Sequence, residues 1–236
     1  MLFGQEMPFG MHGYNRIEVF MQILYQDNSL LVVNKPAGLP VLPDGWDKNA
    51  PYLVRMLEEQ FDKVWVAHRI DKITSGLVVF ALNAEAHRSL SVQFERHEVK
   101  KVYHALVNGI PKWEEKVTKF PLRVNVGHKH RTVVDDRNGA PSETRFKILE
   151  CYQAAALVEA SPMTGRTHQI RVHAYALGYP LLGDVLYSAP ETAVIARPAL
   201  HAHALIFTHP ETGKMVEFQA DYPYDFRTAV DLLRSK

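Results

Sequence analysis

The alternation of hydrophobic and polar positions predicts strands over several parts of the chain. In QILYQDNSLLVVNKPAGL, residues 22–39, two apolar runs flank a polar turn, which is typical of a β-hairpin. KVYHALVNG, residues 101–109, alternates so that Tyr103 lies on one face of a strand and His104 on the other. Further strands are predicted at residues 77–82, as a pair within 144–163, and as a hairpin in 200–220.

Helical periodicity is present in four segments. In residues 84–99, Leu90 and Phe94 share one apolar face. The other helices are predicted at 49–61, with Asn49 as N-cap and Pro51 in the first turn, within 164–184, ending at Gly178 as the C′ glycine, and at 225–236.

This order of elements predicts an α+β fold with a mixed, largely antiparallel sheet, because strands outnumber helices and most neighbouring strands are joined by hairpins. There is no repeat, low-complexity tract or linker, so residues 21–236 are expected to form one domain. Residues 1–20 are rich in Gly and Met and lack periodicity. We expect them to be a poorly ordered or tag-derived extension.

Composition is that of an ordinary soluble globular protein, with 47% hydrophobic and 22% charged residues. The net charge is +1, so only local clusters could make a case for nucleic-acid binding. The one cysteine, Cys151, excludes an intramolecular disulfide and fits the cytoplasm. No apolar run approaches the roughly 20 residues that span a bilayer, and the N-terminus lacks the pattern of a signal peptide.

Several common chemistries have no motif in this chain. There is no G-x-S-x-G elbow, no P-loop and no G-x-G-x-x-G fingerprint, and one cysteine cannot build a Cys-rich zinc site. Among the 12 histidines, His201 and His203 lie two apart on a predicted strand, and His168 and His173 are close in sequence. No H-E-x-x-H signature accompanies them, so a metal site is the disfavoured alternative.

The stretch HRIDKITSGLVVFAL, residues 68–82, sets Asp71 among cationic residues at the start of an apolar strand. One interpretation is a loop of solvated charges, and the other is a catalytic carboxylate in a basic pocket. Downstream, in TGRTHQIRVH, Arg171 lies between Ile170 and Val172 and could emerge from apolar surroundings toward an anion. A buried carboxylate needs such a cation, which would keep it ionised as a nucleophile requires. The spacing alone does not prove that Asp71 and Arg171 meet.

The order VVNKPAGLPV, HRIDKITSGLVVFAL, KKVYHALV and GRTHQIRVHAYALGYPLLGD resembles the RluA-type pseudouridine synthase family from about Ile23 to Ala220. The resemblance implies a pseudouridine synthase fold, with an active-site cleft across the sheet and helices and loops flanking it. It also implies isomerisation of uridine to pseudouridine in folded RNA, without metal or other cofactor. Ile70, in place of the more common leucine, is a conservative departure.

The resemblance also assigns roles to residues. Asp71 matches the catalytic aspartate, whose attack is debated between C1′ of the ribose and C6 of the base. Tyr103 matches the tyrosine that stacks on the target base, and Arg171 matches the arginine that pairs with the aspartate. Ile170 matches an aliphatic residue against the uracil, although a plain core position is equally compatible with the sequence. Arg69 matches an arginine that fills the space of the flipped base.

Other residues are expected to shape the site or contact RNA. Lys35, with Pro36, belongs to a loop that buttresses the site. The remaining RNA-binding candidates are His68, Lys101, Arg166 and His168. Two basic stripes could contact phosphates or could be solvated faces, with equal weight on each: Arg88, Arg96, His97 and Lys100–Lys101 in one, and Lys129, His130 and Arg131 in the other.

About twenty residues precede the first family-like strand, too few for the S4-like RNA-binding domain of many larger relatives. We therefore expect a short member that acts on a stem-loop in large-subunit ribosomal RNA, in transfer RNA, or in both. It is expected to be a monomer that uses no nucleotide cofactor and does not bind membranes. The alternatives are a non-catalytic RNA-binding or chaperone protein on the same fold, which the intact Asp71 disfavours, and a metal-dependent hydrolase.

Overall fold

The computed structural model describes residues 6–7, 21–43, 50–128 and 130–235, and its chain separates into two compact units. The first unit takes residues up to Val99 together with Ala204–Asp221, and the second takes Lys100–His203 and Tyr222–Lys236. Strand β12, Leu200–Thr208, has residues in both. The division into a 1–20 extension and a single domain stays a prediction.

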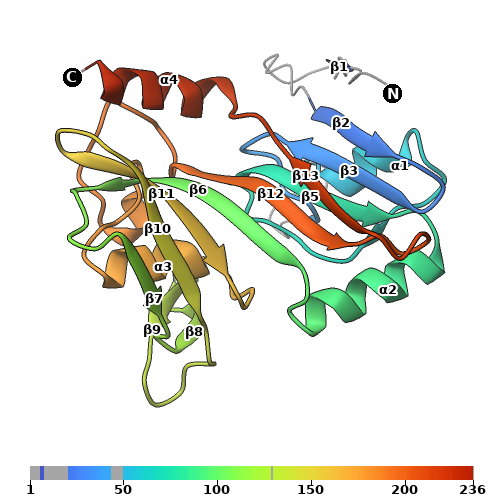
Figure 1. The fold of residues 1–236 in the computed structure, drawn as a ribbon, viewed down its shortest axis with the longest axis horizontal. Coiled ribbons are helices and arrows are strands. Elements are labelled where there is room, and N and C mark those ends of the chain that lie inside the picture. The colour runs from blue at the N-terminus through green and yellow to red at the C-terminus, as the bar shows by residue number, and fades with distance from the viewer. Residues whose placement is uncertain (1–5, 8–20, 44–49, 129, 236) are drawn as a thin grey trace. The chain divides into compact units, whose positions relative to one another are not determined.

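The first unit is built on antiparallel pairs of strands (Figure 1). Strand β2 pairs with β1 and β3, and β5 pairs with β3 and β4, while the end of β12 pairs with β13. Helix α2 packs Ala86 and Leu90 against Leu77 and Val79 of β5. The bounds are β1 Glu6–Met7, β2 Met21–Gln26, β3 Leu30–Lys35, α1 Leu53–Glu58, β4 Trp65–Val66, β5 Ser75–Ala81, α2 Ala84–Glu95 and β13 Met215–Gln219.

In the second unit the antiparallel order is β6, β11, β10 and β7, and β8 pairs with β9 in a separate ribbon. Helix α3 covers one face of these strands and helix α4 covers the other (Figure 1). The bounds are β6 Lys100–Asn108, β7 Glu115–Thr118, β8 Leu122–Val126, β9 Arg131–Val134, β10 Thr144–Cys151, β11 Ala155–Pro162, α3 Gln169–Ala176, the 3₁₀ turn η1 Val185–Tyr187 and α4 Tyr224–Arg234.

The alternation predicted for β6 is confirmed by its packing. Tyr103 and Ala105 lie in the apolar cluster that includes Ile170 of α3, whereas Leu106 lies in the cluster beneath Phe226 of α4. The hairpins β2–β3 and β12–β13, the pair β10–β11, and the helices α2, α3 and α4 also form where the pattern predicts them. Gly178 has φ +87 directly after the α3 C-cap, as expected of a C′ glycine.

Helix α1 is shorter than predicted. It begins at Leu53 with Tyr52 as N-cap, so Pro51 precedes the helix, and Asn49 lies outside the described residues. The backbone N–H groups of Leu53 and Val54 donate to the carbonyls of Pro40 and Val41, at 2.9 and 3.2 Å. A neighbouring loop therefore caps the helix in place of a side chain, which local sequence does not reveal.

Candidate active site

Asp71 lies in the loop between β4 and β5, where the chain turns before entering the buried strand. Its carbonyl accepts a hydrogen bond from the Thr74 backbone N–H at 3.0 Å, which closes the turn. Asp71 is half-buried, Arg69 is exposed and Ile70 is buried beneath them at 7% exposure. Ile70 thus packs into the protein interior while Arg69 is exposed to solvent, and the predicted contact of Arg69 with RNA stays a prediction.

Lys35 fixes this loop from the end of β3. Its fully buried ammonium donates to the carbonyls of Pro36, Leu39 and Lys72, at 2.8, 2.7 and 3.1 Å. The Gly38 N–H donates to the same Lys72 carbonyl at 2.8 Å. Since Lys72 follows Asp71 directly, Lys35 binds the backbone next to Asp71, and its predicted role in the site stays a prediction.

His68 holds the other side of the loop. Its Nε2 accepts a hydrogen bond from the Val79 backbone N–H at 3.0 Å, and its ring stacks on Phe94 at 4.4 Å between centroids. Strand β4 pairs with β5 only at residues 80 and 81 of β5. The His68 ring accepts the next backbone N–H of β5, at Val79, which β4 no longer reaches. This contact requires an unprotonated Nε2. The expected contact of His68 with RNA stays a prediction.

Arg171 lies on the buried face of α3, and its partner in the second unit is Asp184. Arg171 Nε and Nη2 donate to the two carboxylate oxygens of Asp184 at 2.6 and 2.7 Å, and both side chains are about as buried as any in the protein. The ring of Tyr187 lies 5.0 Å from the guanidinium carbon. Neither Asp184 nor Tyr187 was among the predicted site residues, although an acid two residues after Leu182, at the end of an apolar run, signals a need for a cation.

Asp71 belongs to the first unit, and Tyr103 and Arg171 belong to the second. The pairing of Asp71 with Arg171 therefore stays a prediction. Within the second unit, Ile170 belongs to an apolar cluster to which β6, β10, β11 and α3 contribute, and Tyr103 packs against that cluster.

The loop before α3 is held by Gln169, which is buried. Its amide oxygen accepts from the Thr164 hydroxyl at 2.6 Å and from the Arg166 N–H at 3.0 Å, and its amide nitrogen donates to the Glu143 carbonyl at 2.9 Å. Thr164 in turn accepts from the Lys101 ammonium through its carbonyl at 3.1 Å. These contacts link Lys101 to Thr164, two residues before Arg166 in the same loop.

Two of these RNA-side candidates are in distinctive environments. Burial lowers the pKa of Lys101 to about 8. His168, the N-cap of α3, has φ 56, and its Nδ1 lies 2.9 Å from the Tyr187 hydroxyl. Arg166 is exposed. The loop before α3 therefore exposes Arg166 to solvent. It also places His168 against Tyr187, the residue whose ring lies beside Arg171.

The histidines considered as metal ligands have other neighbours. His201 and His203 lie near His104, which stacks on His203 at 4.1 Å and whose Nδ1 lies 2.6 Å from the Tyr222 hydroxyl. Burial, then the nearby His203 and His201, lowers the pKa of His104 to about 3. Among the described residues there is no group of three or more His, Cys, Asp or Glu side chains that could hold a metal ion.

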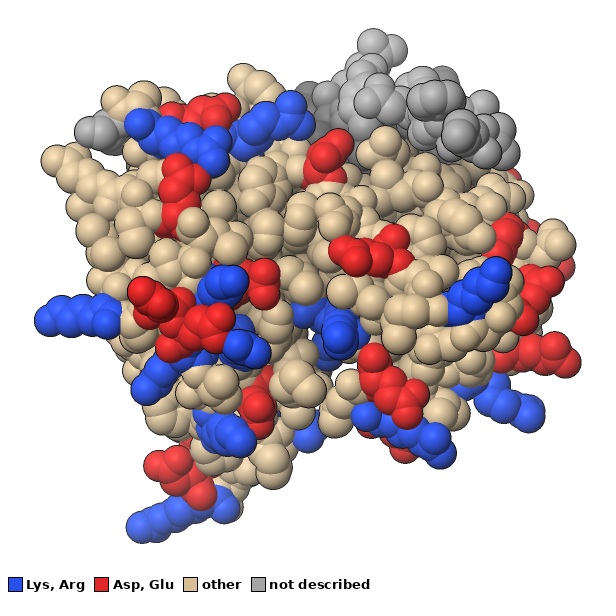
Figure 2. All heavy atoms as spheres, in the orientation of Figure 1, with Lys and Arg blue, Asp and Glu red and all other residues tan. Residues whose placement is uncertain are grey.

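The surface carries charges of both signs. Figure 2 shows Lys and Arg interspersed with Asp and Glu on the face turned to the viewer. In the first predicted basic stripe Arg88, Arg96, His97 and Lys100 are exposed, and in the second His130 and Arg131 are exposed, whereas Lys129 lies outside the described residues. Either stripe is accessible to phosphates, and their contact with RNA stays a prediction.

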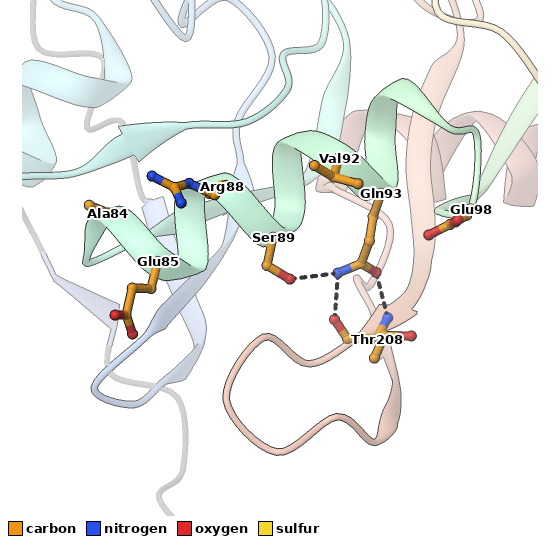
Figure 3. A pocket seen from close by; sticks show the side chains of 8 residues that line it. All are labelled: Ala84, Glu85, Arg88, Ser89, Val92, Gln93, Glu98 and Thr208. Carbon is orange, nitrogen blue, oxygen red and sulfur yellow. Dashed lines mark hydrogen bonds between the residues drawn. The ribbon is translucent and has the colours of Figure 1, made fainter.

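A hollow of about 610 Å³ lies beside α2, where the helix meets Thr208 at the end of β12 (Figure 3). The Gln93 amide there donates to Ser89 and to the Thr208 carbonyl and accepts from the Thr208 N–H, so it completes the end of β12. None of the ten predicted site residues is among the residues that line it: Ala84, Glu85, Arg88, Ser89, Val92, Gln93, Glu98 and Thr208. No helix in the described part of the chain is long and apolar enough to cross a membrane.

Comparisons with known proteins agree with the resemblance seen in the sequence. Residues 29–176 match the family model described as RNA pseudouridylate synthase. The chain is 39% identical over 221 residues to the dual-specificity RNA pseudouridine synthase RluA of Escherichia coli, covering 92% of this chain and 100% of that one. It is 37% identical over 230 residues to ribosomal large subunit pseudouridine synthase D of Neisseria meningitidis, covering 91% of this chain and 61% of that one.

The fold comparison agrees as well. The solved structure of human RNA pseudouridylate synthase domain containing 4 matches with a TM-score of 0.74 and 27% identity, over 90% of this chain and 92% of that one. Domain containing 1 matches with a TM-score of 0.72 and 28% identity. The predicted α+β class and the mostly antiparallel sheet are thereby confirmed. The chain belongs to the RluA-type family of RNA pseudouridine synthases, and it is an RNA isomerase.

Proposed function

We propose that this protein isomerises a uridine to pseudouridine in a stem-loop of large-subunit ribosomal RNA, of transfer RNA, or of both. The observation that carries the choice of substrate is the identity of 39% over the full length of RluA, a relative named for dual specificity. RNA is therefore the partner, and the cytoplasm is the compartment in which we place the reaction.

Asp71 is the proposed nucleophile. Its carboxylate attacks C1′ of the ribose or C6 of the uracil, and the bond between N1 and C1′ breaks. The base then turns and C5 bonds to C1′ while Asp71 is released. The C5 proton is lost and N1 takes up a proton from the solvent, so the product is an isomer of the substrate and no co-reactant is consumed. The anchoring of the loop by Lys35 and His68 supports this role, because a nucleophile gains most from a fixed geometry.

Tyr103, Ile170 and Arg171 are the proposed partners of Asp71 in one site. Tyr103 stacks on the target base and assists removal of the C5 proton, with Ile170 against the uracil. Arg171 keeps the carboxylate ionised. The shared packing of Tyr103 and Ile170 supports their common contact with the base.

The target uridine must leave its stack before it can react, which costs a few kcal/mol. Arg69 is proposed to fill the vacated space, since it is exposed and its guanidinium is planar. Lys101, Arg166 and His168 are proposed to contact the RNA from the α3 loop, and His68 from the Asp71 loop.

Release of tritium from C5-labelled uridine tests this function, because forming pseudouridine expels the C5 hydrogen. The substrates are transcripts of large-subunit ribosomal RNA and transfer RNA, and the variants are Asp71→Asn and, as a control, Asp62→Asn at an exposed acid of the same unit. We expect release with wild type and Asp62→Asn, and none with Asp71→Asn at unchanged melting temperature. Release near the wild-type rate with Asp71→Asn would remove it from the mechanism. RNA binding without release by the wild type would favour a binding function.

A further inference from the structure

Asp184 completes the charge balance of Arg171 inside the second unit. The carboxylate engages the guanidinium through Nε and Nη2, the edge that forms a bidentate pair, and the side chains are 2% and 1% exposed. An isolated guanidinium at that burial would be strongly unfavourable. Arg171 is therefore neutralised before any contribution from another carboxylate.

The backbone around Asp184 leaves it little freedom. Gly183 has φ +73, and a Cβ at that position would lie 2.3 Å from the Arg197 carbonyl oxygen, so only glycine fits. The Asp184 carbonyl accepts from the N–H groups of Tyr187 and Ala189, both at 3.1 Å. The carboxylate is thus held in one place by a tight turn.

Tyr187 holds the face of the same guanidinium. Its hydroxyl accepts from the Thr132 backbone N–H at 3.0 Å and lies 2.9 Å from His168 Nδ1, which fixes the ring over Arg171. Burial raises the pKa of Tyr187, so its phenol stays neutral. Asp184 and Tyr187 are thus titratable groups in contact with Arg171 within this unit, and His168 lies beyond the phenol.

We propose that Asp184 is a positioning residue for the isomerisation. By binding Nε and Nη2 of Arg171, it fixes the orientation of the guanidinium in which the remaining Nη1 group donates to the carboxylate of Asp71. This inference rests on the proposed function, in which Arg171 pairs with Asp71. Asp184 also limits how strongly Arg171 attracts Asp71, because its negative charge competes for the same cation. Asp71 is then kept ionised by Arg171, but the attraction is weak enough that the Asp71 carboxylate can leave the arginine and attack the substrate.

The variant Asp184→Asn tests two effects of Asp184: the orientation of the Arg171 guanidinium and the partial neutralisation of its charge. The carboxamide presents an N–H to one of the Arg171 donors, so the bidentate pair is lost, and the guanidinium retains full charge toward Asp71. We expect the turnover number to fall by up to about a hundredfold, because a misplacement of about 1 Å at a reacting group can cost that much, with little change in KM. The acid limb of the pH–rate profile should move to lower pH, because the ionised form of Asp71 is favoured.

Two further variants give the test its controls. Arg171→Met should move the acid limb to higher pH, and adding Asp184→Asn to it should cause no further loss of turnover if Asp184 acts only through Arg171. Asp225→Asn is the matched control, since Asp225 forms a bidentate pair with Arg197 in the same unit, at 2.7 and 3.0 Å. It should lower the melting temperature without moving the acid limb.

An Asp184→Asn variant that resembles Asp225→Asn, or a loss of turnover that adds to that of Arg171→Met, would overturn the inference and leave the proposed function intact. Absence of tritium release by the wild type would instead overturn the proposed function, and wild-type turnover by Asp71→Asn would remove Asp71 as the nucleophile; either result would overturn this inference as well. The Arg171 Nε–H resonance provides a readout without RNA: its exchange with solvent should be slow in the wild type and fast in Asp184→Asn. Equal exchange in the two would also overturn the inference.

Discussion

The ammonium nitrogen of Lys35 lies 3.1 Å from the carbonyl oxygen of Lys72, the residue that follows Asp71. One buried cation thereby joins the end of β3, the loop at residues 36–39 and the loop of the proposed nucleophile. The position of Asp71 depends on a charge that need not touch the substrate.

Replacing Lys35 with methionine should therefore affect both stability and turnover. Lys35→Met keeps the apolar stem but leaves the Pro36 and Leu39 carbonyls without this donor, so we expect the free energy of unfolding to fall by about 3 kcal/mol. The turnover number should fall as well, because the Asp71 loop loses one of its two anchors. Urea unfolding and tritium release measure the two effects.

Lys63→Met is the matched control. Lys63 is exposed in the same unit and its ammonium lies 3.8 Å from the centroid of the Trp65 ring, so the substitution should cost less than about 1 kcal/mol. Full turnover by Lys35→Met would show that the hydrogen bonds of the Lys35 ammonium contribute to folding alone.

The sequence predicted those elements whose side chains carry a strong pattern. Strand β5 is buried throughout and α2 has a single apolar face, so both were found within a few residues of their bounds. Strands β7, β8 and β9 were not predicted, because most of their side chains are exposed and polar or isolated apolar residues give no alternation. The start of α1 depends on the carbonyls of a neighbouring loop, which is tertiary information.

The candidate site divides in the same way. Lys35 was expected to buttress the site because it stands in a motif, and its three carbonyl partners give that expectation a structural cause. Asp184 was missed because its function depends on Arg171, thirteen residues away in sequence, and only the turn at Gly183 brings the two together. Partnerships of this kind follow from the fold rather than from local pattern.

His68→Phe should loosen the other anchor of the Asp71 loop. The phenyl ring can still stack on Phe94, but the buried Val79 N–H loses its acceptor, which costs about 2 kcal/mol. His68→Gln places an amide group near the position of Nε2 and should restore part of the stability and of the turnover. Equal melting temperatures for the two variants would show that the hydrogen bond to Val79 contributes little.

Lys101 should make RNA binding depend on pH. Its pKa is lowered to about 8 by burial, so the side chain loses its charge between pH 7 and 9, a range in which an exposed lysine keeps it. We expect the affinity for RNA to fall over this range in the wild type and to be lower but flatter in Lys101→Met, with a salt slope reduced by about 1. Filter binding at several salt concentrations measures both.

Lys112→Met, at an exposed lysine of the same unit, is the control for that measurement. It should retain the pH dependence of the wild type. A Lys101→Met protein with the same pH dependence and salt slope as the wild type would remove Lys101 from the RNA interface.

His104 should make the folded state sensitive to acid. Burial beside His203 and His201 lowers its folded pKa to about 3, whereas an unfolded histidine titrates near 6.5. Between these values the unfolded chain binds the proton and the folded chain does not, so stability is full above about pH 6.5 and falls as the pH drops toward 3. His104→Asn keeps a polar group near the Tyr222 hydroxyl but cannot titrate. The free energy of unfolding of this variant, measured with urea, should therefore fall less than that of the wild type between pH 7 and 4.5.

His128→Asn, at an exposed histidine, is the control, and its free energy of unfolding should fall with pH as that of the wild type does. If the free energy of unfolding of His104→Asn falls equally, groups other than His104 govern acid unfolding.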